Sequence, residues 1–263
     1  MDEAVSGLGR AARREQNPRR RTSVVGVIGE VLITAGVIVL LYVVWQLWVG
    51  DLIYGAERNA EGTQLSQEWA EQYDGEDPVV AAPEPDPSTP PTPVTAPPPV
   101  LAEAADGQKF AVMHIPRFGS DYAVPMAGGV TRSRTLDPIG IGHYPGTKMP
   151  GEPGNFALAA HRTTWGKPFN RIADLHVGDA IVVETPDGWY TYRFRTLQYV
   201  RPNEVEVLLP VPQAMDVPAG TAYITMTSCS PMYAMTERIV AYGVFESFTP
   251  RSAGEPASLQ AVA

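Results

Sequence analysis

The amino-acid sequence predicts an all-β domain, either a barrel or a sandwich, and three observations carry this prediction. Short runs rich in β-branched and aromatic residues recur over residues 108–248, with Gly/Pro turns between them. Residues 180–200 hold two such runs around a Pro-Asp-Gly sequence, which is strong turn punctuation and predicts a β-hairpin. The region of about 140 residues is long enough to bury a sizeable core.

The N-terminal residues 1–23 form a basic tail. Six arginines and three acidic residues lie in the first 22 positions, so a nucleic-acid partner has to be considered. The next segment decides against it, because residues 24–49 are apolar and the 19 residues 31–49 carry no charge. At about 1.5 Å per helical residue, this length crosses a hydrocarbon core of about 30 Å. We therefore expect a transmembrane signal-anchor, a membrane partner and no nucleic acid.

The charges on either side of this span predict its orientation. The arginines precede the span, whereas Asp51, Glu57 and Glu61 follow it. The positive-inside rule then places the N-terminus in the cytoplasm and the rest of the chain outside the cell. A cleaved signal peptide is the alternative, but its apolar run is usually about 7–15 residues long. We therefore predict a single-pass cell-membrane protein with an extracellular domain.

Residues 50–107 are predicted to be an extracellular stalk. The first part is acidic, and its apolar residues recur at helical spacing, so a marginal helix or a solvated chain both fit. Ten prolines within residues 78–99 favour an extended polyproline II spacer. Residues 249–263, after the folded domain, are predicted to be disordered.

The folded domain is predicted to occupy residues 108–248. A helical turn is expected within KPFNRIADL, residues 167–175. The strand-like runs outside the hairpin are KFAVMHIPRF, YAVPMA, NFALAA, AYITMTSC and RIVAYGVFESF.

Cys229 is the only cysteine of the chain, and it ends one of these strand-like runs. An exported thiol without an intramolecular partner is sheltered, paired between chains or reactive. No closely spaced pair of cysteines or histidines accompanies it, so we expect no zinc site, no other metal and no cofactor. His161 follows the apolar run FALAA and Arg238 opens the next run, so all three residues lie at predicted strand ends.

These three side chains support nucleophilic acyl transfer. A nearby imidazolium stabilises the thiolate of Cys229 and can protonate a leaving amine. A guanidinium stays charged and can stabilise the oxyanion that forms on an attacked carbonyl. Each residue also has an ordinary alternative, because free cysteines are usually buried for packing and strand-end His and Arg are usually solvated or paired.

The motifs around these residues resemble the sortase family of membrane-anchored cysteine transpeptidases. Residues 225–229, TMTSC, are similar to the family signature T-L-x-T-C, with Arg238 nine residues after Cys229 and His161 68 residues before it. The segment GHYPGT and the signal-anchor make the chain most like class E sortases. The resemblance implies an eight-stranded β-barrel with short helices and with His161, Cys229 and Arg238 as catalytic residues.

The resemblance also implies the reaction and its partners. A Thr–Gly bond would be cleaved in the C-terminal sorting signal of a surface protein, with Leu-Ala-x-Thr-Gly as the implied signal. A thioacyl intermediate would form on Cys229, and an amine of a cell-wall precursor such as lipid II would accept the protein.

Three residues are candidates for substrate binding. Tyr144, in GHYPGT, offers both packing and a hydroxyl to the position after Leu, although a turn residue is an equal alternative. Thr227 and Ser228 directly precede the nucleophile, and Ser228 either presents its hydroxyl there or caps the strand end. His143 is expected to be structural, since His161 already matches the motif.

Two alternatives come from other classes of protein. An L,D-transpeptidase carries a glycine directly before its nucleophilic cysteine and a histidine in the same segment. Ser228 stands at that position here, and no histidine lies between His176 and Cys229. A non-enzymatic, membrane-tethered β-domain explains the anchor and the spacer equally well, and only the set of His, Cys and Arg distinguishes it.

Overall fold

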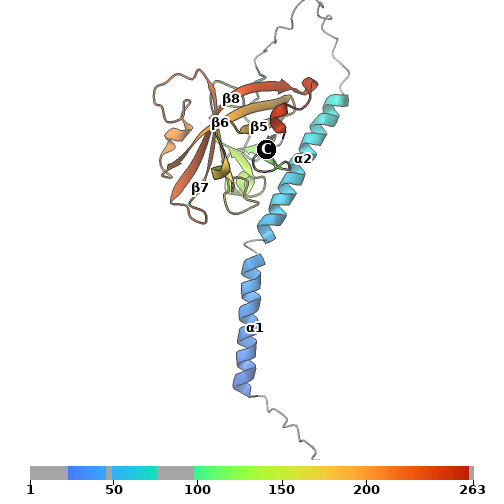
Figure 1. The fold of residues 1–263 in the computed structure, drawn as a ribbon, viewed down its shortest axis with the longest axis vertical. Helices are drawn as coiled ribbons and strands as arrows, with labels where there is room; N and C mark the ends of the chain where they lie inside the picture. The colour runs from blue at the N-terminus through green and yellow to red at the C-terminus, as the bar shows by residue number, and fades with distance from the viewer. Residues whose placement is uncertain (1–22, 46–48, 76–97, 261–263) are drawn as a thin grey trace, which may run out of the picture. The chain divides into compact units, whose positions relative to one another are not determined.

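The structure is a computed structural model, and it describes residues 23–45, 49–75 and 98–260. The chain divides into two units, Met1–Val44 and Trp45–Ala263. In the first unit, α1 (Val24–Val44) has 21 residues and is apolar and long enough to cross a membrane (Figure 1). The basic tail and most of the proline-rich segment lie outside the described residues.

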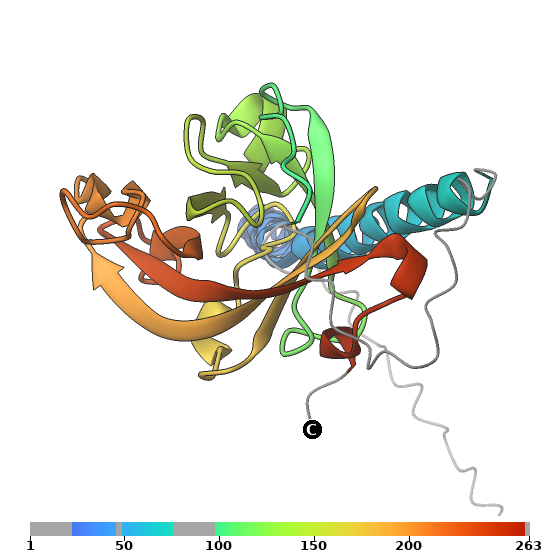
Figure 2. The same cartoon turned by 90° about the horizontal axis from the view of Figure 1, so that it is seen from above.

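The second unit contains a closed β-barrel of eight strands in the order β1-β2-β3-β4-β7-β8-β6-β5 (Figures 1 and 2). The pairs β2–β3 and β4–β7 are parallel, and the other neighbouring pairs are antiparallel. This confirms the predicted all-β fold and selects a barrel over a sandwich. The strands are β1 (Lys109–His114), β2 (Ala123–Gly128), β3 (Ile141–His143), β4 (Gly154–Ala160), β5 (Ala180–Thr185), β6 (Gly188–Val200), β7 (Ala222–Ser230) and β8 (Glu237–Pro250).

The predicted hairpin is β5–β6, in which Thr185 pairs with Gly188. A Cβ on Gly188 would lie 2.2 Å from the carbonyl oxygen of Thr249 on β8, so only glycine fits this corner. The expected helical turn is also present, as the 3₁₀-helix η3 (Ile172–Asp174). The remaining short helices are η2 (Arg132–Leu136), η4 (Val205–Leu208), η5 (Arg251–Ala253) and η6 (Ala257–Leu259).

The inward-facing residues of the strands form one hydrophobic core. It includes Phe156, Leu158 and Ala160 of β4 and Ile224 and Met226 of β7. The methionine in the TMTSC motif is therefore a core residue with no exposed surface. Because side chains alternate along a strand, the odd-numbered positions of β7 and of the end of β4 point outward from the barrel.

The acidic segment after the apolar span forms α2 (Gly50–Gly75), so a helix and not a solvated stalk is present there. This helix packs along the outside of the barrel, mainly against β2 (Figure 2). A Cβ on Gly62 would lie 2.0 Å from the carbonyl oxygen of Ala123, so the helix approaches β2 where only glycine fits. Small and polar residues on one face of α2 contact the barrel, and Tyr54 beside them packs its ring against Trp165 with the centroids 5.4 Å apart. The small and polar residues are Gly55, Arg58, Asn59, Gly62 and Ser66.

The folded domain extends beyond both predicted boundaries. The Tyr190 hydroxyl donates a hydrogen bond of 2.6 Å to the Pro99 carbonyl, and Leu101 packs against the core. The predicted disordered tail contains η5 and η6, and Arg251 of η5 is buried against Glu184 at 3.0 Å. A buried hydroxyl and a buried carboxylate each need a partner, and these flanking segments supply them.

Candidate active site

Three neighbouring strands bring the predicted catalytic residues together. Cys229 on β7 lies directly opposite Arg238 on β8. The parallel pairing of β4 with β7 ends at Ala159 and Thr227, and His161 follows directly after the end of β4, at the end of the barrel where β7 carries Cys229. Because paired residues of adjacent strands point to the same face, Cys229 and Arg238 share the outward face of the barrel wall, and His161 follows β4 at the same end of the barrel. Cys229 is a free thiol and is partly exposed there.

His161 has a carboxylate partner, Asp137, that the sequence analysis missed. The Nε2 atom of His161 and Oδ1 of Asp137 are 2.6 Å apart, and their side chains are only 15% and 18% exposed. A carboxylate in this position accepts a hydrogen bond from Nε2 and fixes the orientation of the imidazole. The Nδ1 atom has no hydrogen-bond partner among the described residues and remains available for proton transfer.

The end of β7 is held to the end of β4 by two hydrogen bonds. The Ser228 hydroxyl donates to the Ala160 carbonyl at 2.8 Å, and both residues are buried. The guanidinium of Arg162, the residue after His161, donates to the Cys229 carbonyl at 3.4 Å. The hydroxyl of Ser228 therefore fastens two strand ends, which favours the capping alternative over contact with a substrate.

Tyr144 lies just after β3 and reaches the outward face of β7. Its hydroxyl is 3.0 Å from Oγ1 of Thr227, which itself donates to the Leu158 carbonyl at 3.1 Å. Since Thr227 uses its only proton there, Tyr144 donates and Thr227 accepts. Thr227 and Cys229 lie on the same face of β7, so the partly exposed Tyr144 lies beside the approach to the thiol.

Arg238 is partly exposed and is held by its own segment of chain. Its Nη1 atom donates to the carbonyls of Met235 and Glu237 at 3.2 and 2.9 Å. Within the described residues, Nη2 has no hydrogen-bond partner and the guanidinium forms no ion pair. One edge of the guanidinium therefore stays free for an anionic oxygen near Cys229.

His143 is buried, as its expected structural role requires. Its ring stacks on Phe156 with the centroids 5.3 Å apart, and Nε2 lies 3.1 Å from the Lys148 carbonyl. Burial lowers the pKa of His143 below its ordinary value, although the bond to Lys148 opposes this. Its Nδ1 atom is buried and has no hydrogen-bond partner within residues 23–45, 49–75 and 98–260, which fits a neutral ring with the proton on Nε2.

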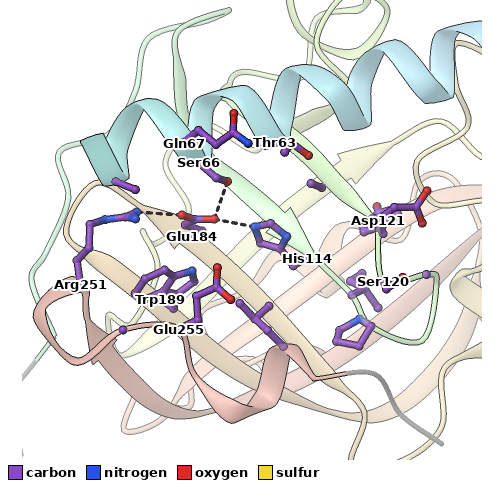
Figure 3. A pocket seen from close by; sticks show the side chains of 18 of the residues that line it. Thr63, Ser66, Gln67, His114, Ser120, Asp121, Glu184, Trp189, Arg251 and Glu255 are labelled. Carbon is purple, nitrogen blue, oxygen red and sulfur yellow. Dashed lines mark hydrogen bonds and ion pairs between the residues drawn. The ribbon is translucent and has the colours of Figure 1, made fainter. Parts of the chain in front are cut away.

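A second polar cluster lies at a cavity of about 660 Å³ that is walled by α2 and the barrel (Figure 3). The buried Glu184 accepts hydrogen bonds from Ser66 at 2.7 Å and Arg251 at 3.0 Å, and lies 2.8 Å from Nε2 of His114. Burial alone would raise the pKa of Glu184, but the bonds from these three partners lower it. Both carboxylate oxygens are occupied, so the cluster fastens α2 and η5 to the barrel and lies apart from Cys229.

No metal site emerges from the part of the chain that the structure describes. Within it, no group of three or more His, Cys, Asp or Glu side chains is arranged to hold an ion.

The fold and the site together define a class of protein. A closed eight-stranded barrel with Cys, His and Arg at the ends of adjacent strands has the architecture of the sortases. Residues 113–246 match the family model of the sortase domain. The chain belongs to the sortase family.

The relatives agree with the expected likeness to class E sortases. The chain is 35% identical to Sortase SrtE1 of Streptomyces coelicolor over 257 residues, covering 94% of this chain and 65% of that protein. It is 30% identical to Sortase SrtE2 of the same organism over 244 residues, covering 90% of this chain and 88% of that protein. The chain thus spans just under two thirds of the length of SrtE1.

Solved structures give the same assignment. The SrtA sortase from Actinomyces oris matches with a TM-score of 0.59 and 34% identity over 62% of this chain and 94% of that chain. Sortase E1 from Streptomyces coelicolor, with a tripeptide in its active site, matches with a TM-score of 0.54 and 38% identity over 60% and 99% of the two chains. Family membership thus disfavours the L,D-transpeptidase alternative.

Proposed function

We propose that the protein is a membrane-anchored cysteine transpeptidase. It cleaves the Thr–Gly bond of a C-terminal sorting signal and transfers the surface protein to an amine of a cell-wall precursor. The observation that carries this proposal is that Cys229 lies opposite Arg238 on neighbouring strands, while His161, held by Asp137, follows the end of the adjoining strand β4. The proposed route uses only side chains of the chain itself.

In the first half-reaction, the Cys229 thiolate attacks the carbonyl carbon of the signal's threonine. The bond from this carbon to the glycine nitrogen breaks, and the protonated His161 gives its proton to the leaving amine. The product is a thioester between the surface protein and Cys229. Since Nδ1 of His161 is free and Nε2 faces Asp137, we assign the transferred proton to Nδ1.

In the second half-reaction, an amine of a wall precursor such as lipid II attacks the thioester carbonyl. His161 takes the proton from the attacking nitrogen, the carbon–sulfur bond breaks, and the Cys229 thiolate is restored. Each half-reaction passes through an oxyanion, and the free edge of Arg238 is suited to stabilise it.

Leu-Ala-x-Thr-Gly is the proposed signal. The class E likeness supports this choice, and Tyr144 stands beside the approach to Cys229 with a ring and a hydroxyl that can contact the residue after Leu. The tripeptide in the active site of the S. coelicolor sortase E1 supports peptide binding in the corresponding place.

We further propose that α1 is the membrane anchor, with the N-terminus in the cytoplasm and the barrel outside. The length and apolarity of α1 support the span, and the arginines before it support the orientation. Protease added to intact cells with a permeabilised wall should then remove the barrel and leave the N-terminal tail. Protection of the barrel would reverse the proposed orientation.

Intact-protein mass spectrometry tests the proposed reaction. The full chain in detergent is mixed with Leu-Ala-x-Thr-Gly and Leu-Pro-x-Thr-Gly peptides, with Cys229→Ala as the control. We expect an acyl adduct from the first peptide that is absent from the variant. An adduct from the second peptide alone would overturn the proposed signal. No adduct from either peptide would favour the non-enzymatic binding domain.

A further inference from the structure

We infer that Arg58, on the helix α2 outside the barrel, is a positioning residue for the catalytic histidine. This inference rests on the proposed function of His161. It assigns α2 a part in the reaction, beyond any role as a link between the apolar helix and the barrel.

The guanidinium of Arg58 is buried where α2 meets two loops of the barrel, and only 6% of the residue is exposed. Its Nη2 atom donates to the Asp137 carbonyl and its Nη1 atom to the Pro138 carbonyl. Its Nε atom donates to the Trp165 carbonyl at 3.1 Å. One side chain of α2 thus joins two segments that are separate in sequence.

Both segments hold His161 in place. Asp137 supplies the carboxylate that lies 2.6 Å from Nε2 of the imidazole. Trp165 lies in the loop that follows His161, and this loop folds back so that Phe169 N–H donates to the His161 carbonyl at 3.1 Å. Trp165 has a φ of +56°, a strained backbone conformation that surrounding contacts must support. Arg58 binds the carbonyl of this strained residue.

Because Arg58 is charged and buried, its guanidinium has to be compensated by hydrogen-bond acceptors. No carboxylate forms an ion pair with it among the described residues, so carbonyl dipoles compensate a buried cation. Burial lowers the pKa of Arg58, and the negative charges of Glu61, Glu57 and Asp137 oppose this. A guanidinium remains protonated and presents donors in a rigid plane, whereas a lysine ammonium cannot reproduce that fork.

Contacts at glycines determine how closely α2 packs against the barrel, independently of Arg58. A Cβ on Gly62 would lie 2.0 Å from the Ala123 carbonyl oxygen, and one on Gly166 would lie 3.0 Å from the backbone nitrogen of Gly55. Backbone therefore meets backbone on both sides of Arg58 along the helix. A larger residue at position 62 should lift α2 and withdraw the guanidinium without altering Arg58 itself.

The test compares variants of the full chain in detergent by the rate of thioester formation on Cys229 across peptide concentrations. Arg58→Gln and Gly62→Leu should lower kcat roughly 10- to 100-fold with little change in KM, because a misplaced catalytic group slows chemistry more than binding. Arg58→Lys should restore activity only in part. Ala60→Leu, at an exposed position of the same helix, should behave like the wild type.

A double-mutant cycle separates positioning from stability. If Arg58 acts through Asp137, then Arg58→Gln should lower kcat only slightly further in a chain that already carries Asp137→Asn. The effects of the two substitutions on kcat should therefore not be additive. Nitrogen-15 NMR of the His161 ring, assigned with His161→Gln, should show its signals shifted or broadened in Arg58→Gln. This readout needs no turnover, so it tests the inference even if the proposed reaction fails.

Two outcomes would overturn the inference. One is a wild type and an Arg58→Gln variant that acylate at equal rates with unchanged His161 signals. The other is a decrease in kcat on Arg58→Gln that is fully additive with that of Asp137→Asn, with a lower Tm as the only other change. Arg58 would then stabilise the fold without positioning His161.

Discussion

Cys229 and Arg238 face each other across the β7–β8 ladder. The nine-residue spacing seen in the sequence is thus the spacing of two opposed positions on an antiparallel pair joined by a short connection. Backbone pairing of the two strands fixes the separation of the two residues along the sheet, and the bond from Nη1 to the Met235 carbonyl in the connecting loop orients the guanidinium.

This relationship predicts the effect of removing the guanidinium. Arg238→Ala should lower kcat roughly 10²–10³-fold, as expected for loss of one oxyanion donor. Arg238→Lys should not fully restore the rate, since an ammonium lacks the planar fork. Single-turnover kinetics would measure both rates, with the exposed Arg201→Ala as a matched control. An Arg238→Ala chain that is unfolded by circular dichroism would make the arginine a structural residue.

His161 should be needed to release the leaving amine. We expect His161→Ala to slow thioester formation by roughly 10²–10⁴-fold, the usual contribution of a general acid. Release of the glycine-containing fragment, followed by chromatography, measures this loss. His176→Ala alters an exposed histidine and should leave the rate unchanged. Near-normal release from the His161→Ala chain would show that another group supplies the proton.

Tyr144 offers a test of signal selection. Tyr144→Phe removes the hydroxyl that donates to Thr227 and should cost about 0.5–1.5 kcal/mol of stability, the usual net worth of such a bond. We also expect a smaller preference for Leu-Ala-x-Thr-Gly over Leu-Pro-x-Thr-Gly, measured as the ratio of kcat/KM values. Tyr199→Phe, on an exposed tyrosine, is the control. An unchanged ratio would assign Tyr144 to the turn alone.

His143 predicts a dependence of stability on pH. Its pKa in the folded chain is lowered by burial, so the unfolded chain, with an ordinary value of about 6.5, takes up the proton first as the pH falls. Stability should therefore decrease as the pH falls through about 6.5. The Tm of His143→Gln should change less between pH 7.5 and 5 than that of the wild type. Equal pH dependence in the two proteins would contradict a neutral, buried His143.

The strands and the three predicted catalytic positions follow from local signals. Alternating runs and the Pro-Asp-Gly turn mark the β5–β6 hairpin, and Cys229 and Arg238 stand at the ends of such runs. Their roles in catalysis remain predictions. The partner of His161 gave no comparable signal, because Asp137 followed by proline reads as an ordinary turn and only tertiary packing brings it to the imidazole.

The role of α2 could not be predicted from its periodicity. A helix usually docks through an apolar stripe, whereas the barrel side of α2 consists mainly of glycines, Asn59, Ser66 and Arg58, with one aromatic contact from Tyr54. From the sequence, such a polar face is expected to be exposed to solvent, because its partners are mainly backbone atoms of loops that are distant along the chain. The stalk prediction failed there because the contacts that stabilise the helix are polar and non-local.

The contacts of Arg58 have a consequence for how this protein can diverge. All three of its acceptors are main-chain carbonyls, which every amino acid carries. Positions 138 and 165 can therefore drift during evolution as long as the backbone keeps its path. Positions 58 and 62 cannot, because Arg58 supplies the guanidinium and Gly62 lets the helix approach β2 closely. In related chains that keep this helix, we expect Arg and Gly to persist four residues apart, together with Asp137 and Gly166, while the side chains at positions 138 and 165 vary.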